Sequence, residues 1–213
     1  DATNNTVAAG MIPEPSASIV WHPAAVRRSD RVTQGMTLWL TGLSASGKST
    51  IATEVERRLV AAGRPAYLLD GDNLRHGLNG DLGFDEAARA ENVRRTAHVA
   101  RLLAESGTVA LVSLVSPYVR DREEAAALHS AIDLAFIEVF VDAPLALCEE
   151  RDPKGLYARA RAGELSGMTG VDAPYEPPLQ PDLVLRSGQE SIEAAVDRVL
   201  GTLGARLLRP AEG

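Results

Sequence analysis

The sequence predicts an α/β fold of three layers, in which a central parallel sheet lies between helices. Two observations support it: short apolar segments alternate with stretches of helical periodicity, and the first of these apolar segments leads into a Gly-rich phosphate-binding pattern. This alternation is typical of parallel sheets, whose strands are joined by helical crossovers. The predicted strands are residues 36–41, 66–69, 109–113, 136–141 and 183–185.

Residues 42–49 read GLSASGKS, which matches the GxxxxGKS pattern of a nucleotide phosphate-binding loop, or P-loop. Glycines at both ends permit close approaches that a Cβ atom would block. The N–H groups between them, and the positive end of a helix predicted over residues 51–59, can surround phosphates. The residues predicted to bind the nucleotide here are Gly42, Leu43, Ser44, Ala45, Ser46, Gly47, Lys48, Ser49 and Thr50.

Of the 22 lysine and arginine residues, only Lys48 and Lys154 are lysines. Because a compact ammonium contacts phosphates differently from a guanidinium fork, both lysines are candidate functional residues. Lys48 is expected to bridge the β- and γ-phosphates, and the Ser49 hydroxyl to hold Mg²⁺. A Gly/Ser-rich turn that matches by chance is the alternative, and the strand before it and the helix after it disfavour that reading.

The second predicted strand ends in Asp70-Gly71-Asp72-Asn73. Its two carboxylates fall at the C-terminal edge of the sheet near the P-loop, where open α/β folds bind ligands. One carboxylate could order Mg²⁺ and its water while the other accepts a proton from an attacking hydroxyl. An Asp-Gly turn that only caps a helix at Asn73 is the alternative.

Two further helices and a lid complete the predicted domain. A long helix is expected between a capping Asp85 and a closing Gly107. A final helix is expected over residues 192–203, after a capping-box pattern from Ser187 to Glu190. Between them, a stretch rich in Gly, Pro and charge is the candidate lid, at about residues 152–175.

Composition excludes some classes of partner. A net charge of −7 and a pI near 5.2 argue against nucleic-acid and anionic membrane partners, which need a basic face. No stretch approaches the roughly 20 apolar residues that span a bilayer. The single cysteine, Cys148, suits a reducing cytoplasm and is expected to be a small buried hydrophobe. Residues 1–34 are interpreted as an extension or linker, and residues 35–213 as one kinase-sized domain.

A P-loop alone also occurs in GTPases, motors and transporters. A GTPase is disfavoured because the sequence has no NKxD-type guanine reader. A DxxG match at residues 152–155 opens the candidate lid instead of ending a switch strand. Size and layout therefore favour a small-molecule kinase of the P-loop NTPase, nucleotide kinase-like type.

Further motifs accompany the P-loop. They are LDGDNLRHGLN (69–79), DLGF (81–84), RAENVRR (89–95), SPY followed by RD (116–121), FIEVFVDAPL (136–145), RDPKGLYARARAGEL (151–165) and MTGVDAPYE (168–176). With GLSASGKST they resemble the adenylylsulfate kinase family over about residues 21–185. The resemblance implies an enzyme that uses ATP and Mg²⁺ to phosphorylate the 3′-hydroxyl of adenosine 5′-phosphosulfate (APS), giving 3′-phosphoadenosine 5′-phosphosulfate (PAPS).

The resemblance also implies roles for single residues. Asp72 matches the acidic residue beside the acceptor hydroxyl, as general base or Mg²⁺-positioning group, and Lys154 would neutralise charge in the transition state. Phe84 would stack on the APS adenine, with Met168 as the opposite wall; a core phenylalanine is the alternative. Ser116 aligns with a serine described as a phosphoserine intermediate, but it lacks an adjacent activating base, so a substrate contact is preferred.

The implied catalytic residues are Asp72, Lys48, Lys154 and Ser116. The implied contacts with APS are Asp70, Asp72, Asn73, Arg75, Phe84, Arg89, Asn92, Val115, Ser116, Lys154, Gly167 and Met168. Arg151 is expected to flank the adenine or phosphates of ATP, with ordinary surface charge as the alternative.

The first twelve residues resemble the closing strand of the GTPase-type large subunit of bacterial sulfate adenylyltransferase. This implies a C-terminal kinase domain of a bifunctional protein, or one associated with sulfate adenylyltransferase subunits, and the family implies a homodimer. Two alternatives remain: another small-molecule P-loop kinase, and a nucleotide-sensing module that binds ATP and APS without transferring phosphate. The set of Phe84, Arg89 and Asn92 disfavours the first alternative. The set of Lys48, Ser49, Asp72 and Lys154 disfavours the second.

Overall fold

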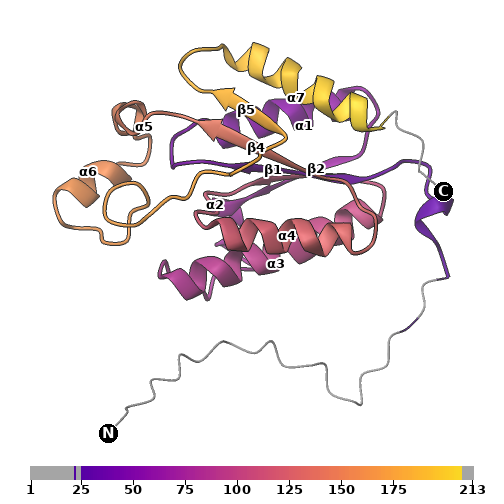
Figure 1. Cartoon of the computed structure of the whole chain (residues 1–213), viewed down its shortest axis with the longest axis horizontal. Helices are drawn as coiled ribbons and strands as arrows, with labels where there is room; N and C mark the ends of the chain where they lie inside the picture. Colours follow the sequence, from indigo (N-terminus) through magenta and orange to yellow (C-terminus); the bar gives the residue numbers. More distant parts are fainter. Residues whose placement is uncertain (1–21, 23–24, 208–213) are drawn as a thin grey trace, which may run out of the picture.

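A computed structural model describes residue 22 and residues 25–207 (Figure 1). Within these residues five parallel strands form one sheet in the order β2-β3-β1-β4-β5. They are β1 (Met36–Thr41), β2 (Ala66–Asp70), β3 (Val109–Ser113), β4 (Phe136–Asp142) and β5 (Leu183–Arg186). The predicted α/β fold and all its strands are confirmed. The resemblance at residues 1–12 lies outside the described residues.

Helices cover both faces of the sheet (Figure 1). One face carries α1 (Lys48–Ala61) and α7 (Ile192–Leu207), and the other carries α3 (Glu86–Glu105) and α4 (Val119–Ser130). The short helices are η1 (Arg28–Asp30), α2 (Gly71–Leu74), α5 (Leu145–Arg151) and α6 (Leu156–Arg161). Among the described residues, no helix is both long and apolar enough to cross a membrane.

The central strand β1 separates two hydrophobic clusters. Leu38 and Leu40 belong to a cluster shared with α1 and α7, whereas Trp39 belongs to one shared with α3 and α4. Every β1 residue is buried, including Thr37 and Thr41, so the mostly apolar segment that predicts this strand reflects burial on both faces. Because all five strands are parallel, their C-terminal ends meet at one edge of the sheet, where the polar residues that follow them gather.

Asp85 and Gly107 bound α3 as the sequence predicts. Asp85 Oδ1 accepts a hydrogen bond from the Ala88 N–H at 2.9 Å. Gly107 has a φ of +94°, and a Cβ atom there would lie 2.5 Å from the Thr33 carbonyl oxygen. A glycine is therefore required both by the backbone conformation and by the close approach of the preceding segment.

The predicted capping box before α7 is wrong. The helix begins at Ile192, and the preceding Ser191 accepts a hydrogen bond from the Ala194 N–H at 3.2 Å. Ser187 instead accepts a hydrogen bond from Arg151, and Glu190 accepts one from the Arg186 N–H. The Ser-x-x-Glu pattern lies about one helical turn before the first residue of α7. Both of its side chains therefore belong to the loop that precedes the helix.

His129 gives the fold a pH-dependent stability. Its buried ring donates from Nδ1 to the Ala125 carbonyl at 2.7 Å, so Nε2 accepts from the Thr37 hydroxyl at 2.8 Å. Burial lowers the pKa of His129, so below about pH 6.5 this ring binds protons more readily in the unfolded chain than in the native protein. The neutral His129 ring therefore contributes its full stability above that pH, and this contribution is lost as the pH falls.

We therefore expect the free energy of unfolding, measured by urea titration, to decrease between pH 7 and pH 5. His129→Gln keeps a neutral polar side chain, and its unfolding free energy should depend less steeply on pH. Equal slopes for the two proteins would show that His129 does not carry the effect.

Candidate active site

The turn between β1 and α1 is the P-loop predicted at residues 42–50. Gly42 has a φ of +148°, and a Cβ atom there would lie 2.5 Å from the Val141 carbonyl oxygen. Gly47 has a φ of +107°, and α1 begins at the next residue. Both glycines are required by the backbone, and the first turn of α1 contributes N–H groups without intrahelical partners to the same place.

Lys48 lies within the P-loop with 7 % of its surface exposed. Its Nζ donates hydrogen bonds to the carbonyl oxygens of Gly42 at 3.0 Å and Leu43 at 2.6 Å. Burial of the ammonium lowers its pKa to about 8, a shift that nearby negative groups such as Asp70 oppose. The loop therefore holds a desolvated cation whose charge an anionic phosphate can complement.

The predicted Mg²⁺ ligand, Ser49, lies among oxygen atoms. Its Oγ donates a hydrogen bond to Asp70 Oδ2 at 2.6 Å and lies 3.0 Å from Ser113 Oγ at the end of β3. Asp70 uses its other oxygen to accept from the Asp72 N–H at 3.0 Å, which fixes the start of α2. Hydroxyl and carboxylate oxygens suit Mg²⁺, which also keeps several waters. Ser113 was missed by the sequence analysis, although its position at a strand end was the available signal.

The structure brings together two of the predicted catalytic residues. Lys154, in the turn before α6, donates to Asp72 Oδ2 and forms an ion pair with it. Both side chains are more than half exposed. The head of the lid and the start of α2 are thus in direct contact across 82 positions of sequence.

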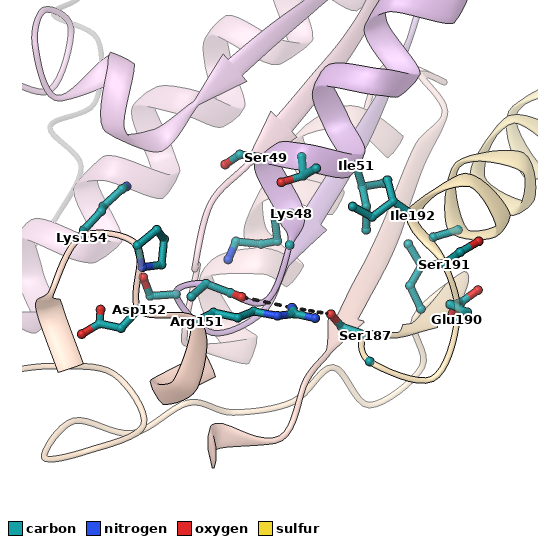
Figure 2. A pocket seen from close by; sticks show the side chains of 18 residues that line it. Lys48, Ser49, Ile51, Arg151, Asp152, Lys154, Ser187, Glu190, Ser191 and Ile192 are labelled. Atoms are coloured by element: carbon teal, nitrogen blue, oxygen red, sulfur yellow. Dashed lines mark hydrogen bonds between the residues drawn. The ribbon is translucent and has the colours of Figure 1, made fainter. Parts of the chain in front are cut away.

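A cleft of about 470 Å³ opens beside the P-loop (Figure 2). One wall is formed by the loop and the start of α1, including Lys48 and Ser49, and another by residues 151–154. The loop from Ser187 to Ile192, between β5 and α7, closes the remaining side. The cleft includes the phosphate-binding groups and is also bounded by mixed polar and apolar side chains, which is typical of a nucleoside site.

Arg151 joins two walls of this cleft. Its Nη1 donates to Ser187 Oγ at 2.8 Å and approaches the carbonyl oxygens of Ala45 and Ser46 at 3.4 Å (Figure 2). These contacts place Arg151 beside the P-loop, and its role toward ATP stays a prediction. The loop that carries Ser187 was not predicted as part of the site, although it follows the last strand at the ligand-binding edge.

Three of the residues implied as APS contacts form one cluster. Phe84 is 59 % exposed, with the Arg75 Cζ 4.1 Å and the Arg89 Cζ 5.9 Å from its ring centroid. Arg75 donates to the carbonyl oxygens of Leu82 and Gly83, and Arg89 to those of Phe84 and Gly167. Burial lowers the pKa of both arginines. Phe84 is thus not a core residue, and its exposed ring lies beside two cations.

Of the other residues implied as APS contacts, Met168 and Asn92 are buried, whereas Asn73 is exposed. Met168 is 7 % exposed and packs in a cluster with Cys148 and Tyr157, so little of its side chain can face Phe84 in this conformation. Asn92 is 8 % exposed and accepts a hydrogen bond from the buried Asn79 at 2.6 Å. Asn73 is exposed on α2.

Ser116 lies with Val115 in the turn after β3. Ser116 is 3 % exposed and has a φ of +38°, which is rare for a residue other than glycine. Its Oγ accepts a hydrogen bond from Trp39 Nε1 at 3.1 Å. Among the described residues, no base contacts this hydroxyl, so nothing activates it as a nucleophile.

Comparisons with known proteins identify the family. A family model for adenylylsulphate kinase matches residues 34–186. The bifunctional enzyme CysN/CysC of Mycobacterium tuberculosis (strain CDC 1551 / Oshkosh) is 52 % identical over 204 residues, or 92 % of this chain and 33 % of that protein. The chain thus spans about a third of the length of this relative. The adenylyl-sulfate kinase of Aeromonas hydrophila is 49 % identical over 196 residues, or 90 % of this chain and 98 % of that one.

A solved structure of the M. tuberculosis APS kinase CysC, in complex with AMPPNP and APS, is similar in fold and sequence. It has a TM-score of 0.79 and 53 % identity, and the match covers 81 % of this chain and 99 % of that one. The family model includes the P-loop, Asp72, Phe84 and Lys154 within its limits. This chain therefore belongs to the adenylylsulfate kinase family.

Proposed function

We propose that this chain transfers the γ-phosphoryl group of ATP to the 3′-hydroxyl of APS, producing PAPS and ADP in sulfate assimilation. Membership of the family supports this activity. The observation that carries the proposal is the contact of Asp72 with Lys154, because it joins the acceptor-side carboxylate to the ATP cleft, which Lys154 lines with Lys48 and Ser49.

On the donor side, the P-loop N–H groups and Lys48 bind the phosphates of ATP, and its nucleoside lies against Arg151 and the loop at residues 187–192. We propose Ser49 and Asp70 as the residues that hold Mg²⁺, directly or through water. When bound, this ion neutralises charge on the β- and γ-phosphates.

On the acceptor side, Phe84 stacks on the adenine of APS, and Arg75 and Arg89 bind its phosphosulfate. The 3′-oxygen forms a bond to the γ-phosphorus while the bond to the β,γ-bridging oxygen breaks, and the hydroxyl proton passes to Asp72. Lys154 moves from Asp72 to the transferring phosphoryl group, where its charge is worth most in the transition state.

The two alternatives differ from this proposal in measurable ways. A sugar or shikimate kinase has no need for an exposed phenylalanine flanked by two arginines, so Phe84 favours a nucleotide acceptor. A nucleotide-sensing module would bind APS and ATP without releasing ADP. The desolvated Lys48 and the contact of Asp72 with Lys154 favour phosphoryl transfer.

Domain boundaries, assembly and location of the chain can also be proposed. We propose residues 35–213 as the kinase domain, with a lid at about residues 152–175, and residues 1–34 as a linker. A homodimer, and fusion to or association with sulfate adenylyltransferase subunits, are proposed from the family and from the bifunctional relative. The free, buried Cys148 is compatible with a cytoplasmic location, which we also propose.

Substituting Ser116 tests whether a covalent step occurs. We expect Ser116→Ala to keep its turnover number within about tenfold of wild type, because its hydroxyl contacts Trp39 and no base, whereas loss of an obligatory nucleophile costs ~10⁴-fold or more. Steady-state kinetics with Ser130→Ala, an exposed serine in α4, provides the control. A loss of the larger size would restore the phosphoserine pathway.

Product analysis tests the proposed function itself. With γ-³²P-labelled ATP and APS, the label should appear in a nucleotide that keeps its sulfate and releases labelled phosphate to a 3′-specific nucleotidase. Label found at another position, or only as inorganic phosphate, would argue for a different reaction.

A further inference from the structure

Two segments on the acceptor side of the site are joined by hydrogen bonds. One is the acceptor turn, residues 115–117 after β3, and the other is the lid end, residues 175–176. The Glu176 N–H donates to the Pro117 carbonyl at 2.8 Å. The Glu176 carboxylate accepts from the Val119 N–H at 2.7 Å, at the start of α4. The lid end is therefore held against the acceptor turn.

Arg122 on α4 connects both segments from within the protein. Its side chain is 2 % exposed, and its Nη1 donates to the Ser116 carbonyl at 2.6 Å. Its Nη2 donates to the Glu176 carbonyl at 2.8 Å, and its Nε donates to Glu138 Oε1 at 2.8 Å. The guanidinium thus contacts the acceptor turn, the lid end and β4 at once, with an ion pair that compensates its buried charge.

Thr41, at the end of β1, makes a second bridge between the same segments. Its Oγ1 donates to the Val115 carbonyl at 2.8 Å and lies 3.0 Å from the Tyr175 hydroxyl. Burial raises the pKa of Tyr175 to about 12, so this hydroxyl is neutral and can donate to Thr41. The Tyr175 ring also stacks on Phe140 at 6.0 Å.

These contacts determine which groups of the acceptor turn face a ligand. The carbonyls of its three residues are bound to Thr41, Arg122 and the Glu176 N–H. Within the described residues, the N–H groups of Val115 and Ser116 have no partner. The left-handed conformation of Ser116 needs surrounding contacts to persist. Arg122 supplies the shortest of these contacts.

We propose that Arg122 is a positioning residue for the acceptor substrate, which holds the acceptor turn in its strained conformation and ties the lid end to it. This proposal rests on the proposed function, because the substrate that Arg122 would position is APS. Arg122 touches none of the residues that line the ATP cleft, so its loss should act on APS and spare ATP.

The test compares Michaelis constants for the two substrates. For Arg122→Met we expect the KM for APS to rise about tenfold or more while the KM for ATP stays within about twofold. Arg122→Lys keeps the charge beside Glu138 but loses the fork, so it should recover part of the APS affinity. The control is Arg58→Met, because Arg58 joins α1 to α7 through carboxylates on the other face of the sheet.

Thr41→Val provides a second, conservative test, should Arg122→Met fail to fold. It removes the other bridge at nearly constant volume and should raise the KM for APS with that for ATP unchanged. A purely structural role for Arg122 would lower the unfolding temperature and leave both Michaelis constants of the folded protein unchanged, which would overturn the proposal. Turnover of the wild-type protein is measured first, because its absence would refute the proposed function. In that case titration calorimetry would still test Arg122: Arg122→Met should weaken binding of APS and leave binding of ATP unchanged.

Discussion

Asp72→Asn should lower the turnover number by about 100- to 10,000-fold, which is the range for loss of a positioned general base. The amide keeps the shape of the side chain but can no longer take the proton of the 3′-hydroxyl. It also loses the charge that pairs with Lys154. Because Asp72 does not line the ATP cleft, the KM for ATP should change little.

Asp81→Asn is the matched control for this experiment. Asp81 is about as exposed as Asp72 and is also ion-paired, but its partner is Arg95. Its substitution should leave turnover within about twofold. If Asp72→Asn behaved like Asp81→Asn, Asp72 would have no place in the chemistry.

Lys48→Arg should lower kcat/KM for ATP by about 100-fold or more, even though the charge is retained. Lys48 Nζ lies within hydrogen-bond distance of the Gly42 and Leu43 carbonyl oxygens, and the side chain is almost fully buried. A planar guanidinium is larger than the ammonium and cannot occupy the same place without moving the loop. Steady-state kinetics and ATP titration calorimetry would measure the loss.

Arg57→Lys supplies the reverse exchange on the same helix. Arg57 is exposed on α1 and pairs with Glu54, so its replacement should not change ATP kinetics. ATP kinetics of Lys48→Arg equal to wild type would mean that charge alone, and not the geometry of the ammonium, is required in this loop.

The sequence predicts the sheet well because its central strands, β1 and β3, are buried along their whole length. Residues 36–41 are therefore mostly apolar, and the glycines at residues 42 and 47 mark a turn that few other residues can form. Helix α3 is predictable for a similar reason, since Asp85 and Gly107 act through local backbone contacts.

The contacts that assemble the site could not be predicted in the same way. Lys154 and Asp72 are 82 residues apart, and only the folded chain shows that they meet. Arg122 lies in a helix that sequence periodicity does not distinguish, and its partners are mainly backbone carbonyls, which leave no trace in the sequence. The wrong capping box before α7 shows that a local pattern can also mislead. The Ser-x-x-Glu spacing predicts a cap only if the serine directly precedes the helix, and here Ser191 holds that position.

If the proposed function is correct, phosphoryl transfer from ATP requires APS. ADP release should therefore be measured with Mg²⁺ and ATP, with APS present or with adenosine 5′-monophosphate in its place. We expect sustained ADP release with APS and only a small background with the monophosphate. APS binding without ADP release would contradict the proposed function and favour a nucleotide-sensing module, whereas equal release under both conditions would show that APS is not the acceptor.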